Sequence, residues 1–152
     1  MDECGISAFL RRLFGYTESG TRYNAFIPGK RSKRTNVIGA WSQSDKLFAV
    51  QTYEGTINRE IFTHWVKDHL VPHLKPNVAV IMDNASWHKS DEIRELIENT
   101  GAKLIFLPPY SPDLNSIEHV WANLKAAIRK NAHLFENNAD NIHAQIKALG
   151  TF

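Results

Sequence analysis

Residues 78–107 constrain the fold of this chain more than any other segment. Residues 78–82 form an unbroken apolar run that is too short for a helix, which predicts a buried strand. A helix follows, capped by Ser90 or Asp91, and residues 103–107 form a second short apolar strand. A strand, a helix and a strand with short connections predict a right-handed parallel crossover. Both strands then end at the same edge of one sheet, which is where open α/β sheets bind ligands.

The rest of the chain extends this pattern to a mixed sheet flanked by helices. Two β-branched and aromatic runs, residues 35–41 and 46–53, lie on either side of a turn and predict antiparallel strands. Apolar residues at helical spacing predict three more helices, from Asn58 to about Pro72, from Asn115 or Ser116 to about Ile128, and over residues 138–149. We therefore expect an α/β fold.

Length and composition fit a single domain over residues 1–152, because 43% hydrophobic residues are enough to bury a sizeable core. The net charge of +2 does not by itself indicate a nucleic-acid partner. Cys4 is the only cysteine, which excludes an internal disulfide framework and suits a reducing cytoplasm. No apolar run approaches the ~20 residues that span a bilayer, and the first residues do not resemble a signal peptide. We expect a cytoplasmic protein with no membrane partner.

Asp83 and Glu118 are the acids that this topology places for chemistry. Asp83 follows the strand at residues 78–82, and Glu118 lies in the first turn of a helix. Each also has a structural interpretation, Asp83 as a turn residue and Glu118 as the acid of a capping box begun by Asn115. Hard divalent ions prefer carboxylate oxygens, and two such ions can align the oxygens of a phosphoryl transfer. Asp2 is the candidate for a third acid.

Three motifs in the chain resemble one known family. They are residues 2–5 (Asp-Glu-Cys-Gly), residues 82–90 (Met-Asp-Asn-Ala-Ser-Trp-His-Lys-Ser) and residues 106–118, which contain Pro-Pro-Tyr-Ser-Pro-Asp-Leu-Asn. Together they resemble the catalytic domain of DDE transposases of the mariner superfamily. Within that superfamily the likeness is greatest to the bacterial insertion-sequence-630 type. Thirty-four residues separate Asp83 from Glu118, which is the spacing that distinguishes this group.

The resemblance implies an RNase H-like fold in which Asp2, Asp83 and Glu118 are the catalytic residues and hold two divalent ions, Mg²⁺ with Mn²⁺ as a substitute. The implied reaction is cleavage of a phosphodiester at a transposon end by water, followed by attack of the freed 3′-hydroxyl on target DNA. The implied partners are double-stranded DNA and a second copy of the chain, in the bacterial nucleoid. Glu3 is interpreted as a solvated or structural neighbour of Asp2.

The chain departs from the family pattern at two places. Ser116 stands where members usually have proline, a change that preserves a helix start. In the implied fold the first acid lies within the first strand, so we expect most of the residues that precede Asp2 in that strand to be missing and the strand to be truncated. We also expect the N-terminal helix-turn-helix region that reads transposon ends to be absent. The family implies extended structure in residues 1–20. A helix is instead predicted by the spacing of the apolar residues Ile6, Phe9, Leu10, Leu13 and Phe14. Both interpretations stay open.

Basic residues near two turns are candidates for contacting DNA. The first group is Lys30, Arg31, Lys33 and Arg34, four basic residues in five positions, which can neutralise phosphates or simply form a solvated loop. His88 and Lys89 lie just beyond Asp83 and are further DNA-binding candidates, although a structural hydrogen bond is an alternative role for His88. Tyr110 either contacts DNA or orders the proline-rich loop.

The acids, the motifs and the basic residues are consistent with two different functions. The first is a metal-dependent transposase catalytic domain that cleaves and joins DNA strands. The second is a catalytically silent DNA-binding remnant of a transposase. A glycosidase with two carboxylates is a third hypothesis, with less support than the other two, because nothing in the sequence indicates a sugar cleft.

Overall fold

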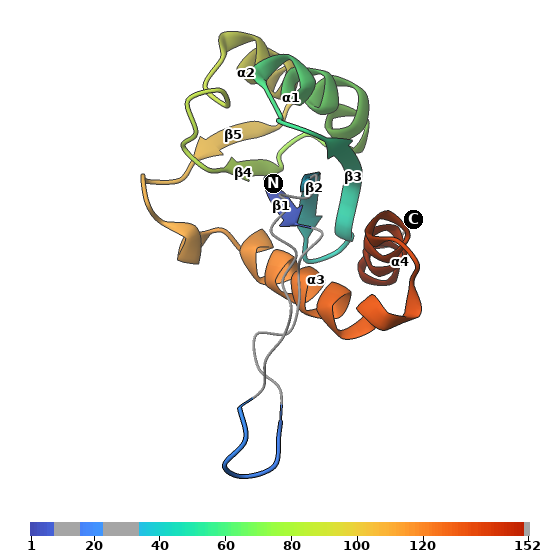
Figure 1. The fold of residues 1–152 in the computed structure, drawn as a ribbon. Coiled ribbons are helices and arrows are strands. Elements are labelled where there is room, and N and C mark those ends of the chain that lie inside the picture. The colour runs from blue at the N-terminus through green and yellow to red at the C-terminus, as the bar shows by residue number, and fades with distance from the viewer. Residues whose placement is uncertain (8–15, 23–33, 151–152) are drawn as a thin grey trace.

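The computed structural model describes residues 1–7, 16–22 and 34–150 (Figure 1). Its first sheet is antiparallel, with the order β1 (Asp2–Ser7), β2 (Arg34–Ser42) and β3 (Lys46–Glu54). The two predicted antiparallel strands are therefore confirmed. β1 shows that extended structure is correct for the first residues, whereas most of the predicted helical spacing lies outside the described part of the chain.

The predicted crossover is also confirmed. β4 (Ala79–Met82) and β5 (Lys103–Phe106) pair in parallel and are connected through α2 (Asp91–Glu98). Ser90 caps this helix, because its hydroxyl accepts a hydrogen bond from the amide of Ile93. The two strands consequently end side by side, and pairing continues one step beyond them in the bond from Leu107 N to Met82 O, at 2.9 Å.

The strands differ from the prediction in how they join and in what they bury. Among the described residues they form two sheets rather than one mixed sheet, and the N-terminal ammonium of Met1 bridges them by donating to the carbonyl of Ile81 at 2.8 Å. The expectation that β4 is buried throughout is wrong. Val80 and Met82 are buried, whereas 41% of Ile81 is exposed, because helices cover only one face of β4 and β5.

Helices lie on both sides of the strands (Figure 1). α1 (Arg59–Trp65) is capped by Asn58 and continues through a π-helical segment, Val66–Leu70, and a 3₁₀ turn, Val71–His73. On the other side lie α3 (Ile117–Asn131) and α4 (Asn138–Leu149), which agree closely with the predicted helices. A 3₁₀ turn, Ala132–Leu134, connects these two helices.

Two hydrophobic clusters hold these layers together. One lies beneath α1 and α2 and contains Trp65, which is fully buried. The other lies between the three-stranded sheet and α3 and α4, and it contains Trp121, which is 1% exposed. Both tryptophans are therefore core residues. No helix in the part of the chain that the structure describes has the length and apolar character needed to cross a membrane.

Candidate active site

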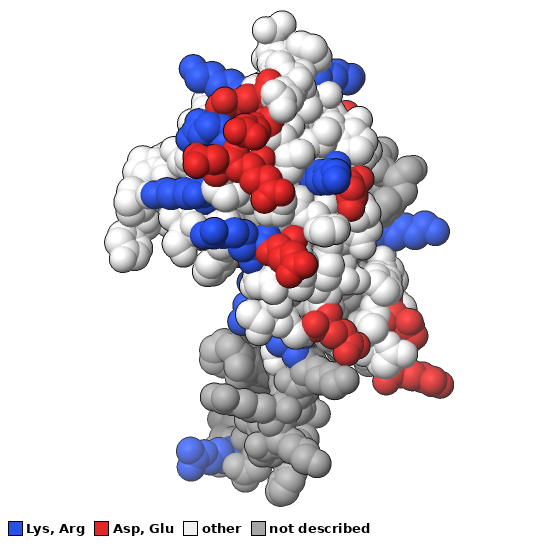
Figure 2. Space-filling view, turned by 90° about the horizontal axis from the view of Figure 1, so that it is seen from above, with Lys and Arg blue, Asp and Glu red and all other residues white. Residues whose placement is uncertain are grey.

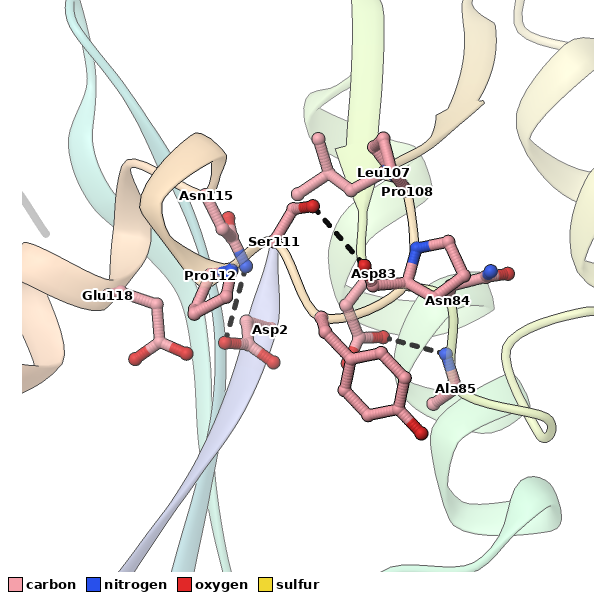
Figure 3. A pocket seen from close by; sticks show the side chains of 12 residues that line it. Asp2, Asp83, Asn84, Ala85, Leu107, Pro108, Ser111, Pro112, Asn115 and Glu118 are labelled. Carbon is pink, nitrogen blue, oxygen red and sulfur yellow. Dashed lines mark hydrogen bonds between the residues drawn. The ribbon is translucent and has the colours of Figure 1, made fainter.

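The three predicted carboxylates line one pocket of about 490 Å³ (Figure 3). Asp2 is the first residue of β1, Asp83 follows β4 directly, and Glu118 lies in the first turn of α3. In Figure 3 Asp2 lies between Glu118 on one side and Asp83 on the other. The fold therefore brings together acids that are separated by 81 and 35 positions in the sequence.

Asp2 is the most buried of the three acids, with 7% of its surface exposed. Burial raises the pKa of its carboxyl from 3.8 to about 7, and the neighbouring charges of Glu3, Glu118 and Asp83 add to this increase. Its Oδ1 accepts a hydrogen bond from the amide of Glu3 at 2.8 Å, which opposes the increase. Ionisation of Asp2 is thus disfavoured by poor solvation and by the negative charges around it.

Asn115 is a pocket residue that the sequence analysis missed. It was interpreted only as the possible start of a capping box, yet it is 6% exposed and its side-chain amide donates to Asp2 Oδ2 at 3.4 Å. The backbone amide of Glu118 in turn donates to the carbonyl of Asn115 at 3.0 Å. Asn115 therefore links the start of α3 to β1. The signal that could have identified Asn115 is its place at the Asp-Leu-Asn end of the proline-rich motif.

Asp83 is held at one of its two carboxylate oxygens. Its Oδ1 accepts hydrogen bonds from the amide of Ala85 at 3.1 Å and from His88 Nδ1 at 2.5 Å. The bond from His88 is the main reason that the pKa of Asp83 lies below its ordinary value, although partial burial acts in the opposite direction.

His88 is fully buried, and both of its ring nitrogens face carboxylates. Nδ1 contacts Asp83, and Nε2 lies 3.2 Å from Glu3 Oε2. Burial alone would lower the pKa of the ring, but hydrogen bonds to Asp83 and Glu3 outweigh it and raise the pKa to about 9. A ring enclosed in this way has no nitrogen directed toward a DNA phosphate. The structure therefore supports the alternative prediction for His88, a structural hydrogen-bonding role beside Asp83.

The other predicted DNA-binding residues lie in different surroundings. Arg34 is exposed at the start of β2, and Lys30, Arg31 and Lys33 lie outside the described residues. Lys89 is exposed and lines a second hollow of about 390 Å³ together with Arg94. Asn84 lines this hollow and the acidic pocket, so the two are adjacent. Figure 2 shows acidic and basic side chains interspersed over the face that it presents.

The proline-rich loop forms the outer wall of the acidic pocket. Pro108, Pro109 and Pro112 line it, and a 3₁₀ turn at Pro112–Leu114 leads toward α3. Tyr110 also lines the pocket, is fully exposed and has a backbone φ of 57°, which is unusual for a residue with a bulky side chain. Since its ring is exposed, Tyr110 does not order the loop by burying itself.

The donor chemistry of the pocket fits divalent metal ions. Carboxylate oxygens are the ligands that Mg²⁺ and Mn²⁺ prefer. Burial is the main cause of the raised pKa of Asp2, and the charges of Glu3, Glu118 and Asp83 add to it, so a bound cation would favour the ionised carboxylate. In the arrangement seen, no group of three acidic, histidine or cysteine side chains among the described residues is arranged to hold one ion. The chemistry of the site therefore suits metal ions, whereas the side chains as they lie do not form a complete metal centre.

Solved structures share this fold. The Mos1 strand transfer complex superposes with a TM-score of 0.64 at 18% identity, covering 99% of this chain and 53% of that one. A Mos1 mariner paired-end complex with Mn gives 0.56 at 17% identity, covering 97% and 52%. The catalytic core domain of BIV integrase gives 0.51 at 13% identity, covering 79% of each chain. The fold is therefore that of the RNase H-like catalytic cores of transposases and integrases.

The family of the chain follows from its sequence. A family model described as DDE superfamily endonuclease matches residues 1–140, so the chain belongs to this family. A relative, the transposable element Tcb1 transposase of Caenorhabditis briggsae, is 28% identical over 98 residues, covering 62% of this chain and 35% of the relative. The chain spans about a third of the length of the relatives it matches.

Proposed function

We propose that this chain is the catalytic domain of a transposase of the bacterial insertion-sequence-630 type, which cleaves DNA and transfers the freed strand to target DNA. The observation that carries the proposal is the shared pocket of Asp2, Asp83 and Glu118, built from β1, the end of β4 and the start of α3. Membership of the DDE superfamily endonuclease family supports it.

The proposed chemistry has two steps of in-line attack on phosphorus. In the first, a water oxygen forms a bond to phosphorus as the bond to the 3′ oxygen breaks, which frees a 3′-hydroxyl. In the second, that hydroxyl attacks a target phosphorus and displaces the 3′ oxygen of the target strand. Asp2, Asp83 and Glu118 would hold two Mg²⁺ or Mn²⁺ ions, which neutralise phosphate charge and align the oxygens when bound. Asn115 and His88 hold two of these carboxylates in place.

Basic residues around the pocket are proposed to hold the DNA backbone. Lys89 and Arg94, which line the hollow beside Asn84, would neutralise phosphates that lead into the acidic pocket, with Arg94 exchanging its exposed ion pair with Glu98 for a phosphate. Arg34, with Lys30, Arg31 and Lys33, is proposed to contact DNA farther along the duplex. Recognition of transposon ends is assigned to a helix-turn-helix region outside residues 1–152, and the active assembly to a homodimer on DNA in the nucleoid.

Metal binding tests the assignment of the three acids. We expect the chain to bind Mn²⁺ saturably in a titration followed by electron paramagnetic resonance, and Asp83→Asn and Glu118→Gln to abolish that binding without unfolding the chain. Asp113→Asn is the matched control, because Asp113 belongs to the same proline-rich loop and does not line the pocket. If Asp83→Asn and Glu118→Gln bind Mn²⁺ as the unaltered chain does, the assignment is wrong.

DNA cleavage tests the reaction. We expect the chain to nick supercoiled plasmid DNA in the presence of Mn²⁺ and to stop doing so in Asp83→Asn. The lack of a formed three-residue metal centre among the described residues favours a second candidate, a silent DNA-binding remnant. That candidate predicts retention of DNA on a gel without Mn²⁺-dependent nicking, and loss of retention when Lys30, Arg31, Lys33 and Arg34 are replaced together.

A further inference from the structure

β1 contributes an acid to each of its two faces next to the pocket. Asp2 faces α3, where it accepts the hydrogen bond from Asn115. Glu3, the next residue, faces the opposite layer and reaches His88 at 3.2 Å. The sequence analysis interpreted Glu3 only as a solvated or structural neighbour. Its side chain is in fact 22% exposed and is joined to the residue that holds Asp83.

Four neighbours hold the His88 ring in place. Nδ1 lies 2.5 Å from Asp83 Oδ1, and Nε2 lies 3.2 Å from Glu3 Oε2. One face of the ring stacks on Phe62 of α1, with the ring centroids 4.2 Å apart. Trp87 meets the ring edge-on at 5.8 Å. A ring with both nitrogens occupied and one face packed has little freedom to rotate, so it presents Nδ1 to Asp83 in a fixed direction.

This ring determines how the Asp83 carboxylate lies. Oδ1 is occupied by His88 and by the amide of Ala85, whereas Oδ2 has no hydrogen-bond partner among the described residues. One oxygen of a ligand carboxylate is then tied down and the other stays available to the pocket. Hydrogen-bonding partners of this kind orient metal ligands, and their loss typically weakens metal affinity about 10- to 100-fold.

We propose that Glu3 and His88 are positioning residues, which act in series to fix the carboxylate of Asp83 for metal binding. Glu3 accepts a hydrogen bond from His88, and His88 in turn holds Oδ1 of Asp83. β1 therefore contributes two residues to the pocket, Asp2 on one face as a metal ligand and Glu3 on the other face as a positioning residue. The inference rests on the proposed function, because it gives Asp83 the role of a metal ligand.

Two substitutions of His88 separate its two contacts. In His88→Asn the side-chain amide nitrogen takes the place of Nδ1, so the bond to Asp83 is kept and the reach to Glu3 is lost. In His88→Gln the amide nitrogen takes the place of Nε2, so Glu3 is reached and Asp83 is not. We expect His88→Gln to weaken Mn²⁺ binding about 10-fold or more and His88→Asn to weaken it clearly less.

A pair of variants at Glu3 tests the anchor without altering the buried ring. Glu3→Ala removes the acceptor for Nε2 and is expected to weaken Mn²⁺ binding severalfold, whereas Glu3→Gln keeps an acceptor oxygen and is expected to restore most of the affinity. Far-ultraviolet circular dichroism selects the variants that are folded. This pair still decides the question if the His88 variants do not fold.

The outcomes separate this inference from the proposed function. Loss of Mn²⁺ binding in Asp83→Asn, with wild-type affinity in His88→Gln and Glu3→Ala, overturns the positioning role and leaves the metal assignment intact. Equal weakening in Glu3→Ala and Glu3→Gln also overturns it, because an acceptor at this position would then be irrelevant. Wild-type affinity in Asp83→Asn overturns the proposed function, and this inference with it.

Discussion

At the scale of single residues, His88 makes the stability of the metal-free chain depend on pH. Its pKa is about 9 in the folded chain and 6.5 in a model peptide, because Asp83 and Glu3 stabilise the charged ring. Below pH 6.5 the ring is charged in the folded and the unfolded chain, and its stabilising contribution is fully present. As the pH rises through 9 the folded chain also loses the proton, and this contribution is lost.

We therefore expect the free energy of unfolding of the unaltered chain to exceed that of His88→Asn by more at pH 6.5 than at pH 9.5, by on the order of 2 kcal/mol. Urea denaturation followed by tryptophan fluorescence, with a chelator present, measures this difference. The comparison with the variant is needed because the buried Met1 ammonium, whose pKa is lowered to about 6, acts in the opposite direction between pH 6 and 8. A difference that does not change with pH would contradict the prediction.

At the scale of elements, the backbone at the start of α3 already has the conformation that a proline requires. Ser116 has a φ of −57° and its side chain makes no capping hydrogen bond, while Asn115 before it is extended, as a residue that precedes proline must be. We expect Ser116→Pro to raise the free energy of unfolding by about 0.5 kcal/mol, because it restricts the unfolded chain without a loss in the folded one. Chemical denaturation measures the change.

Ser90 is the matched control for this prediction. It also stands directly before a helix, α2, but its backbone is extended and its hydroxyl accepts the hydrogen bond from the amide of Ile93 at 3.2 Å. Ser90→Ala is expected to cost about 1 kcal/mol, whereas Ser116→Ala is expected to cost much less. Destabilisation by Ser116→Pro, or equal costs for the two alanine variants, would show that the start of α3 is held in another way.

At the scale of the whole molecule, local sequence patterns predicted which elements form and where two of the acids lie. The apolar run before Asp83 and the helical stripe around Trp121 each depend on neighbours in the chain, and the structure confirms a strand and a helix there. The parallel crossover then placed Asp83 at the correct edge. Asp2 was a candidate for the third acid from the sequence alone, whereas its assignment as a ligand of both ions was implied only by the resemblance to a family.

The remaining features depend on packing between distant segments. Glu3 and His88 are 85 positions apart, and they meet only because β1 lies beside the loop that follows β4. Asn115 is 113 positions from Asp2, so its hydrogen bond could not be distinguished from helix capping by sequence alone. The exposure of Ile81 has a related cause, because an apolar run shows that a strand has apolar faces and does not show which of them a helix covers.

The junction of the two sheets determines the last prediction. Met1 is buried and its ammonium bridges the sheets, although burial lowers the pKa of this group to about 6 and so opposes its charge. Next to it is a hollow of about 670 Å³, with residues 40–42 of β2 on one side and residues 78–81 on the other. Asp2 pairs with Gly39, so residues ahead of Met1 in an extended conformation would run along β2 past Ala40.

We expect a five-residue extension of alternating valine and threonine ahead of Met1 to raise the melting temperature by several degrees, since about 1 kcal/mol corresponds to roughly 2–4 °C at this chain length. An amide would replace the poorly solvated ammonium, and the added strand would find hydrogen-bonding edges on β2 and β4 together with apolar surface at Val78 and Ile81, each about 40% exposed. A glycine and serine extension of equal length is the control, because it removes the ammonium without strand propensity or apolar side chains. Equal melting temperatures for the two extended chains would mean that removal of the terminal charge, and not strand addition, accounts for any gain.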